Sequence, residues 1–439
     1  MGFQDSRGLP ISTQSSKAAQ DYRDGVDLLL SAWPGAVETL TEAAEADPAF
    51  ALAEAALARA FAVRAQPHRA KQHIEKATEL VEVEGTDREK SHVATLALAI
   101  AGEGARALDS ALAHTDRWPR DTIILGLPLG AFGLFAFSGM RDHDQARVDL
   151  CDRHAAQFAG DDWWFLTYRG WSHAENGNLT FGLDLARAGF ELRRANANGA
   201  HAVSHAMFEA GATEDAERFI GDWLPTYDRS GVLYGHIAWH EAFSALERGD
   251  PERALDIYGR HVQPSTSEGL PINIMSDTVS LLWRMEAYGH AVPKALWEEA
   301  AAYARARFPT PGLAFVDAHL GLAAAATGDR GDTDARVAAL TRMVEAGTLT
   351  AGAVVPALCR AVLAFAESKY DKCTEILEPM VDEIARIGGS GAQREVFEDT
   401  LLLALIRSRQ TQKARAMLDK RLHQRPSRRD TAWLRQIPA

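Results

Sequence analysis

Cysteine is scarce in this 439-residue sequence, which contains only Cys151, Cys359 and Cys373. Three thiols so far apart cannot form a disulfide framework or a thiolate metal site, so we expect reduced core residues. Long apolar runs are also lacking, and none approaches the roughly 18 residues that a membrane span requires. Residues 1–16 are polar and contain no apolar signal segment. These absences predict a soluble, cytoplasmic protein.

Basic residues are in deficit: 47 Lys and Arg stand against 60 Asp and Glu, for a net charge of −13. A negative chain repels phosphate backbones unless its basic residues share one face. They are concentrated only in residues 413–429, near the C-terminus. We therefore expect neither nucleic acid nor a membrane as a partner. The segment from Arg421 to Arg429 is predicted to be a solvated, partly frayed terminus.

Alanine is abundant, as in residues 51–60 and 322–326, whereas β-branched residues are thinly spread. This composition favours helix. The hydrophobic share of 46% and the charged share of 24% are ordinary for a folded chain, so a sizeable core is available. The composition predicts an all-α protein.

A short signal recurs along the chain, most clearly in Glu209-Ala-Gly-Ala-Thr-Glu-Asp-Ala216 and Glu247-Arg-Gly-Asp-Pro-Glu-Arg-Ala254. Each copy places a Gly at the end of one helix and a small residue five positions later, where two helices approach closely. The same register, with spacings of 34 to 41 residues, gives eleven small residues: Ala36, Ala70, Ala105, Ala146, Gly182, Ala216, Ala254, Ala295, Ala335, Cys373 and Ala414. The shortest spacing is the tetratricopeptide period.

This register predicts a right-handed α–α superhelix, a tetratricopeptide-like solenoid of about eleven helix pairs. One pair cannot bury its own apolar face, so stacking supplies the core and no internal boundary is expected. We expect residues 1–20 to form an N-terminal arm against the array, residues 21–425 a single superhelical domain, and residues 426–439 a C-terminal tail. The Pro-containing loops 263–271 and 308–312 are predicted to fold over a rim or a cavity.

Several motifs occur in an order that resembles the tetratricopeptide repeat protein 38 family. They are Gly8-Leu-Pro-Ile-Ser-Thr13, Arg88-Glu-Lys-Ser-His92, His201-x-x-x-His205, His236-x-x-x-His240, Asp317-Ala-His319 and Gly388-Gly-Ser-Gly-Ala-Gln-Arg394. The resemblance covers nearly the whole chain and implies a tetratricopeptide-like solenoid. It implies no particular reaction.

Two histidine pairs are the strongest functional signal. His201 and His205 fall at the fifth and ninth positions of their unit, and His236 falls near the second position of the next, all of which usually face the concave groove of such arrays. Residues four apart share one helix face, so His240 accompanies His236. Two stacked helices would then direct up to four imidazoles into one space.

Polar and aromatic residues accompany the histidines on the predicted inner wall, with little aliphatic surface. The neighbouring units supply Asp277, Arg284, Asp317 and His319 on one side, and Trp164, Tyr168 and Trp171 as stacking walls on the other. Such a lining suits a polar or charged ligand with some flat apolar area.

Three interpretations of the histidines stay open. They can bind a divalent metal through His201, His205, His236 and His240, with Asp277 or Asp317 completing the set, although no H-E-x-x-H pattern is present. They can act in acid–base catalysis, for which His205, His240 and Asp317 are the candidates. They can also be structural residues that hydrogen-bond between adjacent helices.

The leading functional hypothesis is a binding protein whose concave, histidine-rich pocket holds a polar small molecule or a peptide segment. A second is a pocket enzyme, a hydrolase or lyase that uses the same His, Asp and Arg cluster with or without a metal. A third is an interaction scaffold that binds a protein partner through its outer surface or its basic C-terminal tail. No organic cofactor is predicted; a divalent metal is the one candidate.

Overall fold

The computed structural model describes residues 2–437, which are almost entirely helical. The sole strands in this part of the chain, β1 (Phe3–Gln4) and β2 (Pro10–Ile11), form an antiparallel hairpin. The first helices are α1 (Ser16–Leu30), α2 (Ala36–Ala46), α3 (Ala51–Val63), α4 (Pro67–Glu84), α5 (Asp87–Ile100), α6 (Gly104–Arg117), α7 (Thr122–Leu125), α8 (His143–His154), α9 (Trp163–Glu175), α10 (Leu179–Leu192), α11 (Ala197–Glu209) and α12 (Thr213–Trp223).

The remaining helices are α13 (Tyr234–Glu247), α14 (Pro251–Ile257), α15 (Pro271–Ala287), α16 (Lys294–Arg307), α17 (Ala314–Thr327), α18 (Arg330–Glu345), α19 (Val354–Ala366), α20 (Tyr370–Leu377), α21 (Gly391–Arg407), α22 (Thr411–Gln424) and α23 (Arg428–Gln436). Short 3-10 turns are η1 (Ala136–Ser138), η2 (Ala155–Gln157) and η3 (Leu224–Thr226). A longer 3-10 segment is η5 (Glu378–Ile387), and η4 (Tyr258–Val262) is a π-helical turn. None of the helices within residues 2–437 is long and apolar enough to cross a membrane.

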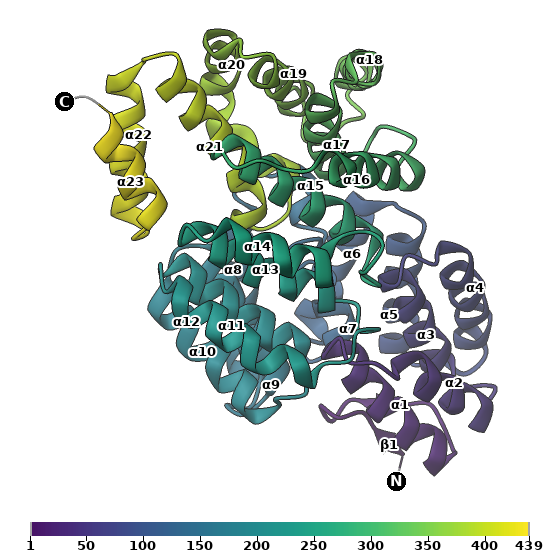
Figure 1. The fold of residues 1–439 in the computed structure, drawn as a ribbon. Coiled ribbons are helices and arrows are strands. Elements are labelled where there is room, and N and C mark those ends of the chain that lie inside the picture. Colours follow the sequence, from purple (N-terminus) through teal and green to yellow (C-terminus); the bar gives the residue numbers. More distant parts are fainter. Residues whose placement is uncertain (1, 438–439) are drawn as a thin grey trace.

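Except for α7 and α8, consecutive helices pack in pairs from α1/α2 to α21/α22, and α23 follows as a last single helix. The pairs stack into a curved array whose purple N-terminal and yellow C-terminal parts lie on different sides of the teal middle (Figure 1). The predicted tetratricopeptide-like solenoid of about eleven pairs is therefore confirmed. The pair α7/α8 is irregular, because α7 has only four residues and the loop 126–142 separates the two helices.

Local signals set the helix ends as the sequence predicts. Asp250 caps α14 by accepting a hydrogen bond from the Arg253 backbone N–H at 3.0 Å, and Pro251 occupies the first turn. Gly249 precedes them with φ +86°, a left-handed conformation that glycine adopts at low cost. A turn of this kind reverses the chain between the two helices of a pair.

The small-residue register is only partly correct. Ala216 and Ala254 are fully buried between their helices. Ala105, Ala295 and Ala335 are exposed, so the predicted register is wrong in α6, α16 and α18. Alanine favours helix on any face, so an alanine at the right spacing does not by itself mark a helix contact.

The N-terminal segment lies against the array and closes it. In the arm, the Ser12 backbone N–H and hydroxyl both donate to Glu89 at the start of α5, at 2.8 and 2.6 Å. The end of α1 contacts units far along the chain: the Asn198 side chain donates to the Leu30 carbonyl at 2.9 Å, and the Tyr227 hydroxyl donates to the Ala32 carbonyl at 2.6 Å. The first unit thus meets the sixth.

The prediction of a solvated, frayed C-terminal tail is wrong. Arg421 and Arg429 are buried, and α23 packs on α22. Arg421 pairs with Glu395, Asp399 and Asp430 at 2.6 to 2.9 Å. The basic residues gathered there serve an internal ion-pair network, because the acidic faces of the preceding helices need compensating charge when they are buried.

Candidate functional site

Four histidines from α11 and α13 converge, and we call His201, His205, His236 and His240 the His tetrad. One ring nitrogen from each lies within 4.8 Å of the corresponding nitrogen of every other member. The Nε2 atoms of His201 and His236 are 3.0 Å apart. His205 and His240 lie deeper and are fully buried. The helical spacing of four explains the pairs, and the stacking of α11 on α13 brings the two pairs together.

Two carboxylates hold the tetrad from behind. His205 Nδ1 lies 2.8 Å from Glu175 Oε1, and His236 Nδ1 lies 2.8 Å from Asp277 Oδ2. Glu175 also accepts a 2.8 Å hydrogen bond from the Gly391 backbone N–H. A carboxylate at Nδ1 places the proton of a neutral imidazole there, so the Nε2 lone pairs of His205 and His236 point toward the centre of the tetrad.

The environment lowers the pKa values of His201, His240 and Glu175. Burial, and after it the neighbouring histidines, holds the pKa values of His201 and His240 well below their ordinary value of 6.5. Burial alone would raise the pKa of Glu175, but His205 and the Gly391 N–H together lower it to about 2. Neutral imidazoles with available lone pairs are the form that binds metal ions.

Several ring nitrogens of the tetrad lack a partner. Neither Nδ1 nor Nε2 of His240 has a hydrogen-bond partner within residues 2–437, and the same is true of His205 Nε2. A buried polar atom without a partner carries an appreciable desolvation cost, so such atoms are uncommon unless a ligand or ion satisfies them. Three of them meeting in one cluster mark this place as a candidate site.

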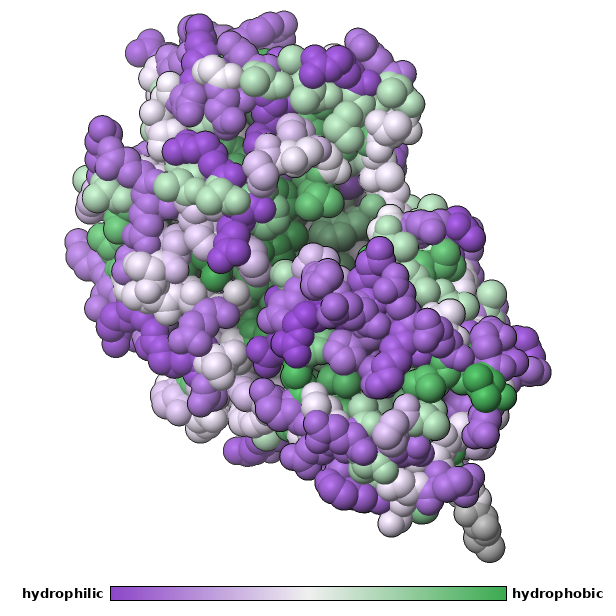
Figure 2. All heavy atoms as spheres, turned by 90° about the vertical axis from the view of Figure 1, so that its right-hand side faces the viewer, coloured by the Kyte–Doolittle hydropathy of each residue, from purple (hydrophilic) through white to green (hydrophobic). Residues whose placement is uncertain are grey.

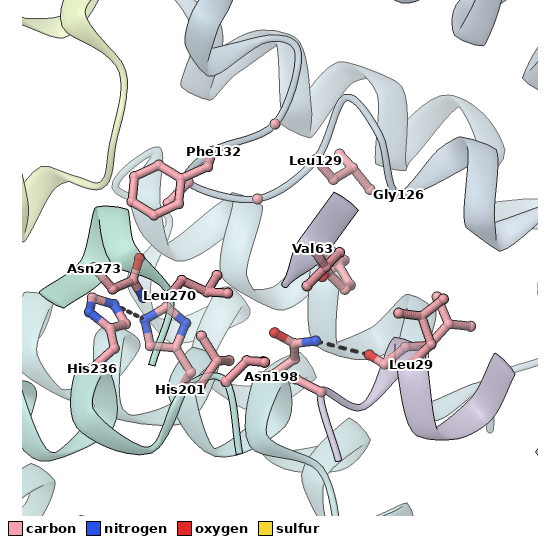
Figure 3. A pocket seen from close by; sticks show the side chains of 18 of the residues that line it. Leu29, Val63, Gly126, Leu129, Phe132, Asn198, His201, His236, Leu270 and Asn273 are labelled. Carbon is pink, nitrogen blue, oxygen red and sulfur yellow. Dashed lines mark hydrogen bonds between the residues drawn. The ribbon is translucent and has the colours of Figure 1, made fainter. Parts of the chain in front are cut away.

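A cavity of about 420 Å³ adjoins the tetrad, with His201 and His236 in its wall. Trp164, Tyr168 and Trp171 of α9 also line it. In Figure 3, His201 and His236 lie side by side near Leu270 and Asn273, and Asn198 and Leu29 lie further along the same cavity. Figure 2 shows an apolar hollow on the molecule's surface between its upper and lower parts.

The lining differs from the one predicted. Aliphatic and glycine surface makes up much of the wall, from Leu29, Leu30, Ala62, Val63, Gly126, Leu129, Gly130, Val232, Leu233, Leu270 and Ile272. The expectation of little aliphatic surface is therefore wrong. The first two units, the loop after α7 and the segments that lead into α13 and α15 supply these residues, because the solenoid closes over its inner face. The predicted cover loops 263–271 and 308–312 do reach the cavity, through Leu270, Pro271 and Phe308.

Arg59 of α3 brings a positive charge to this wall. It forms no ion pair with any Asp or Glu that the structure describes, and no carboxylate affects its pKa. Burial lowers the pKa of Arg59 below its ordinary value. An arginine that faces a cavity without an acidic partner is suited to pair with an anionic ligand.

Three of the predicted site residues lie elsewhere. Asp317 does not complete the tetrad, because it pairs with Arg336 of the following helix at 2.5 Å. His319 Nδ1 bonds the Phe315 carbonyl at 2.8 Å, one turn back in its own helix. Arg284 is buried beside Asp399, 3.4 Å away, and stacks on Phe243. Asp277 is at the site, but it bonds His236 rather than lining the cavity.

A second cluster contains His92, His114 and Asp121. His92 Nδ1 and His114 Nε2 lie 2.9 and 3.3 Å from Asp121 Oδ2. Arg88 also pairs with Asp121, at 2.6 Å, and donates to the Pro10 carbonyl at 2.7 Å. The guanidinium already neutralises the carboxylate, so this cluster anchors the N-terminal arm.

Two residues of the candidate site, Glu175 and Arg59, were not predicted from the sequence. Glu175 is the last residue of α9, the first helix of the unit before α11, and the sequence Glu175-Asn-Gly is typical of a turn rather than of a site. Arg59 lies in an alanine-rich helix, about 140 residues before His201 in the sequence. Arg59 is the one basic residue of that helix, whose only other charged residue is Glu54, and this was the available signal. The direction of the Arg59 side chain, into the cavity, depends on the closure of the array.

These observations define the class: a tetratricopeptide-like helical-repeat scaffold with a cavity on its inner face. No protein-family model matches the chain. A chain of the APC/C hetero-tetramer Cut9–Hcn1 is similar over 97% of both chains, with 10% identity and a TM-score of 0.35. Yeast Tom70 is similar over 95% of this chain and 86% of its own, with 12% identity and a TM-score of 0.33.

Proposed function

We propose that this protein is a binding protein whose cavity holds a small organic molecule with an apolar body and an anionic group. The observation that carries the proposal is Arg59, a guanidinium in an apolar wall with no acidic partner among the residues described. A carboxylate or phosphate on the ligand would supply that partner through a charge-assisted hydrogen bond. Trp164 and Tyr168 offer flat surfaces for the body of the ligand.

The cavity suits a small molecule better than a peptide. Its volume of about 420 Å³ falls in the range of small-molecule sites. The contacts of Leu30 with Asn198, and of Ala32 with Tyr227, join the first unit to the sixth across the groove. An extended peptide needs an open groove along several units, and this closure interrupts it.

A matched pair of probes tests the proposal. We expect 4-phenylbutyrate to bind the purified protein in isothermal titration calorimetry more tightly than the neutral 4-phenylbutanol of nearly equal size. The Arg59→Gln variant should lose at least tenfold in affinity for the acid and little for the alcohol, because only the acid uses the guanidinium. Arg69→Gln, at an arginine that stacks on Phe61 away from the cavity, is the control. Equal affinities of wild type and Arg59→Gln for the acid would refute the proposal.

A second candidate function is catalysis in the same cavity. The observation that favours it is the chain Asp277–His236–His201, in which a carboxylate orients one imidazole against another at the cavity wall. Incubation of wild type and His236→Asn with a metabolite extract of the host, followed by mass spectrometry, tests it. A product that only the wild type forms would establish catalysis. If both proteins leave the extract with the same composition, catalysis is refuted and binding is the remaining function.

We also propose that the chain is a member of the tetratricopeptide repeat protein 38 family. The motifs that carry the resemblance meet in space: Ser12 of the first contacts Glu89 of the second, and Gly391 of the last bonds Glu175 behind the tetrad. If the family shares this arrangement, its members should retain Glu175 together with His205.

A protein partner on the outer surface is a further prediction, and such a partner should still bind the Arg59→Gln variant.

A further inference from the structure

The His tetrad combines a donor set, a spacing and a second layer of residues that together suit a metal ion. We propose that His201, His205, His236 and His240 bind one divalent transition-metal ion of the zinc type, with Glu175 and Asp277 orienting two of the ligands. This inference concerns residues other than Arg59, so it stands or falls separately from the binding of an organic anion.

The spacing of the nitrogens is close to what an ion requires. Two imidazole nitrogens on a tetrahedral zinc ion lie about 3.3 Å apart, given bonds of about 2.0–2.1 Å. The nitrogens of His201 and His236 are 3.0 Å apart, and all four fall within 4.8 Å of one another. Small side-chain rotations therefore suffice to bring them onto one ion, because both helices hold their pairs on facing surfaces.

The donor chemistry narrows the choice of ion. Imidazole nitrogen suits zinc, copper, iron and nickel, whereas magnesium and calcium prefer oxygen ligands. No thiol lies in the tetrad, and both carboxylates contact imidazole Nδ1 atoms instead of the centre. The arrangement carboxylate–histidine–metal is the usual way in which proteins fix the ring and strengthen its lone pair.

The polar surroundings also favour a cation. The carboxylates of Glu175 and Asp277 lie 2.8 Å from the Nδ1 atoms of His205 and His236, on the side of the rings away from the centre. The nearby guanidinium of Arg284 is already accompanied by Asp399 at 3.4 Å. The ion would also satisfy the nitrogens of His240 and His205 that lack partners in the part of the chain described.

The second histidine cluster provides an internal contrast. His92 and His114 approach Asp121, but Arg88 occupies the same carboxylate at 2.6 Å. A fixed positive charge at that distance opposes a cation. We therefore expect one site per chain, at the tetrad.

The experiment uses the full chain, freed of metal by a chelator and then dialysed. Titration with ZnCl₂ against a chromophoric chelator should show one tightly bound equivalent. X-ray absorption of the zinc-loaded protein should show four nitrogen ligands near the distance typical of Zn–imidazole, about 2.0–2.1 Å. The His205→Gln/His240→Gln variant should lose the tight equivalent, a decrease in affinity of at least a hundredfold. His114→Gln, at the second cluster, should keep it.

A single variant guards against misfolding. His201→Gln changes the partly exposed member of the tetrad and should weaken zinc binding while the far-ultraviolet circular dichroism of the metal-free protein stays the same. Zinc binding of wild type no tighter than that of the folded variants would overturn the inference. Arg59→Gln should bind zinc normally, so a failure of the metal site and a failure of the organic-anion site give different results.

Discussion

Individual carboxylates decide how well the tetrad binds an ion. Asp277→Asn keeps an oxygen near His236 Nδ1 but removes the negative charge that strengthens the imidazole as a ligand. Loss of such an outer partner usually costs 10–100-fold in metal affinity, and we expect a decrease of that order for zinc. Competition titration measures it. The exposed Asp256→Asn should match wild type, and an unchanged affinity in Asp277→Asn would show that the carboxylate does not act on the metal.

A buried histidine outside the tetrad makes stability depend on pH. His319 is fully buried against Phe315 and Phe397, and burial, together with the charge of Arg284, lowers its pKa to about 4 despite the bond to the Phe315 carbonyl. The unfolded chain takes up this proton near pH 6.5 and the folded chain only near pH 4, so acidification between these values favours unfolding. At pH 5 the loss amounts to about 2 kcal/mol.

Urea unfolding at pH 7 and pH 5 tests this assignment. The free energy of unfolding of His319→Gln should fall by about 2 kcal/mol less than that of wild type between the two pH values. His423→Gln, at an exposed histidine, should retain the wild-type difference. The same pH dependence in His319→Gln and wild type would mean that other groups account for it.

The helix pair α9/α10, which supports the cavity wall and Glu175, depends on glycine. A Cβ atom on Gly182 would lie 2.6 Å from the Ala174 backbone nitrogen and 2.7 Å from the Gly170 carbonyl oxygen. Backbone atoms cannot move aside as a flexible side chain can. Gly182→Ala should therefore lower the free energy of unfolding by about 1–3 kcal/mol, as overpacked contacts do.

Thermal unfolding followed by circular dichroism measures this change. Gly104→Ala is the matched control, because a Cβ atom there has nothing within 4 Å and sits in a helix, where alanine is favoured by up to about 1 kcal/mol. It should be neutral or stabilising. A neutral Gly182→Ala would show that the two helices can separate without cost.

At the scale of helices, the sequence predicted much of what the structure contains. Gly at helix ends and Asp-Pro at helix starts predicted the helix pairs. The spacing of four residues predicted that His201 lies beside His205 and His236 beside His240. The partner of Asp317 was not predictable, because Arg336 lies on the next helix and its approach depends on the packing of that pair. The exposed Ala335 shows the same limit: composition gives the helix but not its rotation.

At the scale of the molecule, the closure of the helical array could not be predicted from the sequence. Helical periodicity describes neighbours along the array, whereas the contact of Leu30 with Asn198 joins residues 168 positions apart. The cavity depends on this contact, since Leu29, Leu30 and Arg59 line it together with His201 and His236 only when the first units fold back. Single units therefore predict an open groove, whereas the structure contains a cavity with an aliphatic wall and one guanidinium.

The closing contacts predict how the cavity opens. Asn198→Ala/Tyr227→Phe removes the side-chain donors to the Leu30 and Ala32 carbonyls and leaves the backbone bond from Ala197 to Ser31. Each lost hydrogen bond costs about 1 kcal/mol, so opening of the first unit should become about 2 kcal/mol easier, roughly thirtyfold in equilibrium. Hydrogen exchange detects such local opening.

Exchange measured by mass spectrometry should then show faster labelling of α1 in the double variant, while α17 and α19 on the far side of the array keep their protection. Tyr370→Phe is the control, because its hydroxyl bonds the nearby Ser368 at the start of α20 and makes no contact with the first unit within residues 2–437. Zinc should remain bound, since α11 and α13 carry the tetrad, whereas 4-phenylbutyrate should dissociate faster because its wall has loosened. Unchanged labelling of α1 would mean that apolar packing alone holds the array closed, and the cavity would then be a rigid feature of the solenoid.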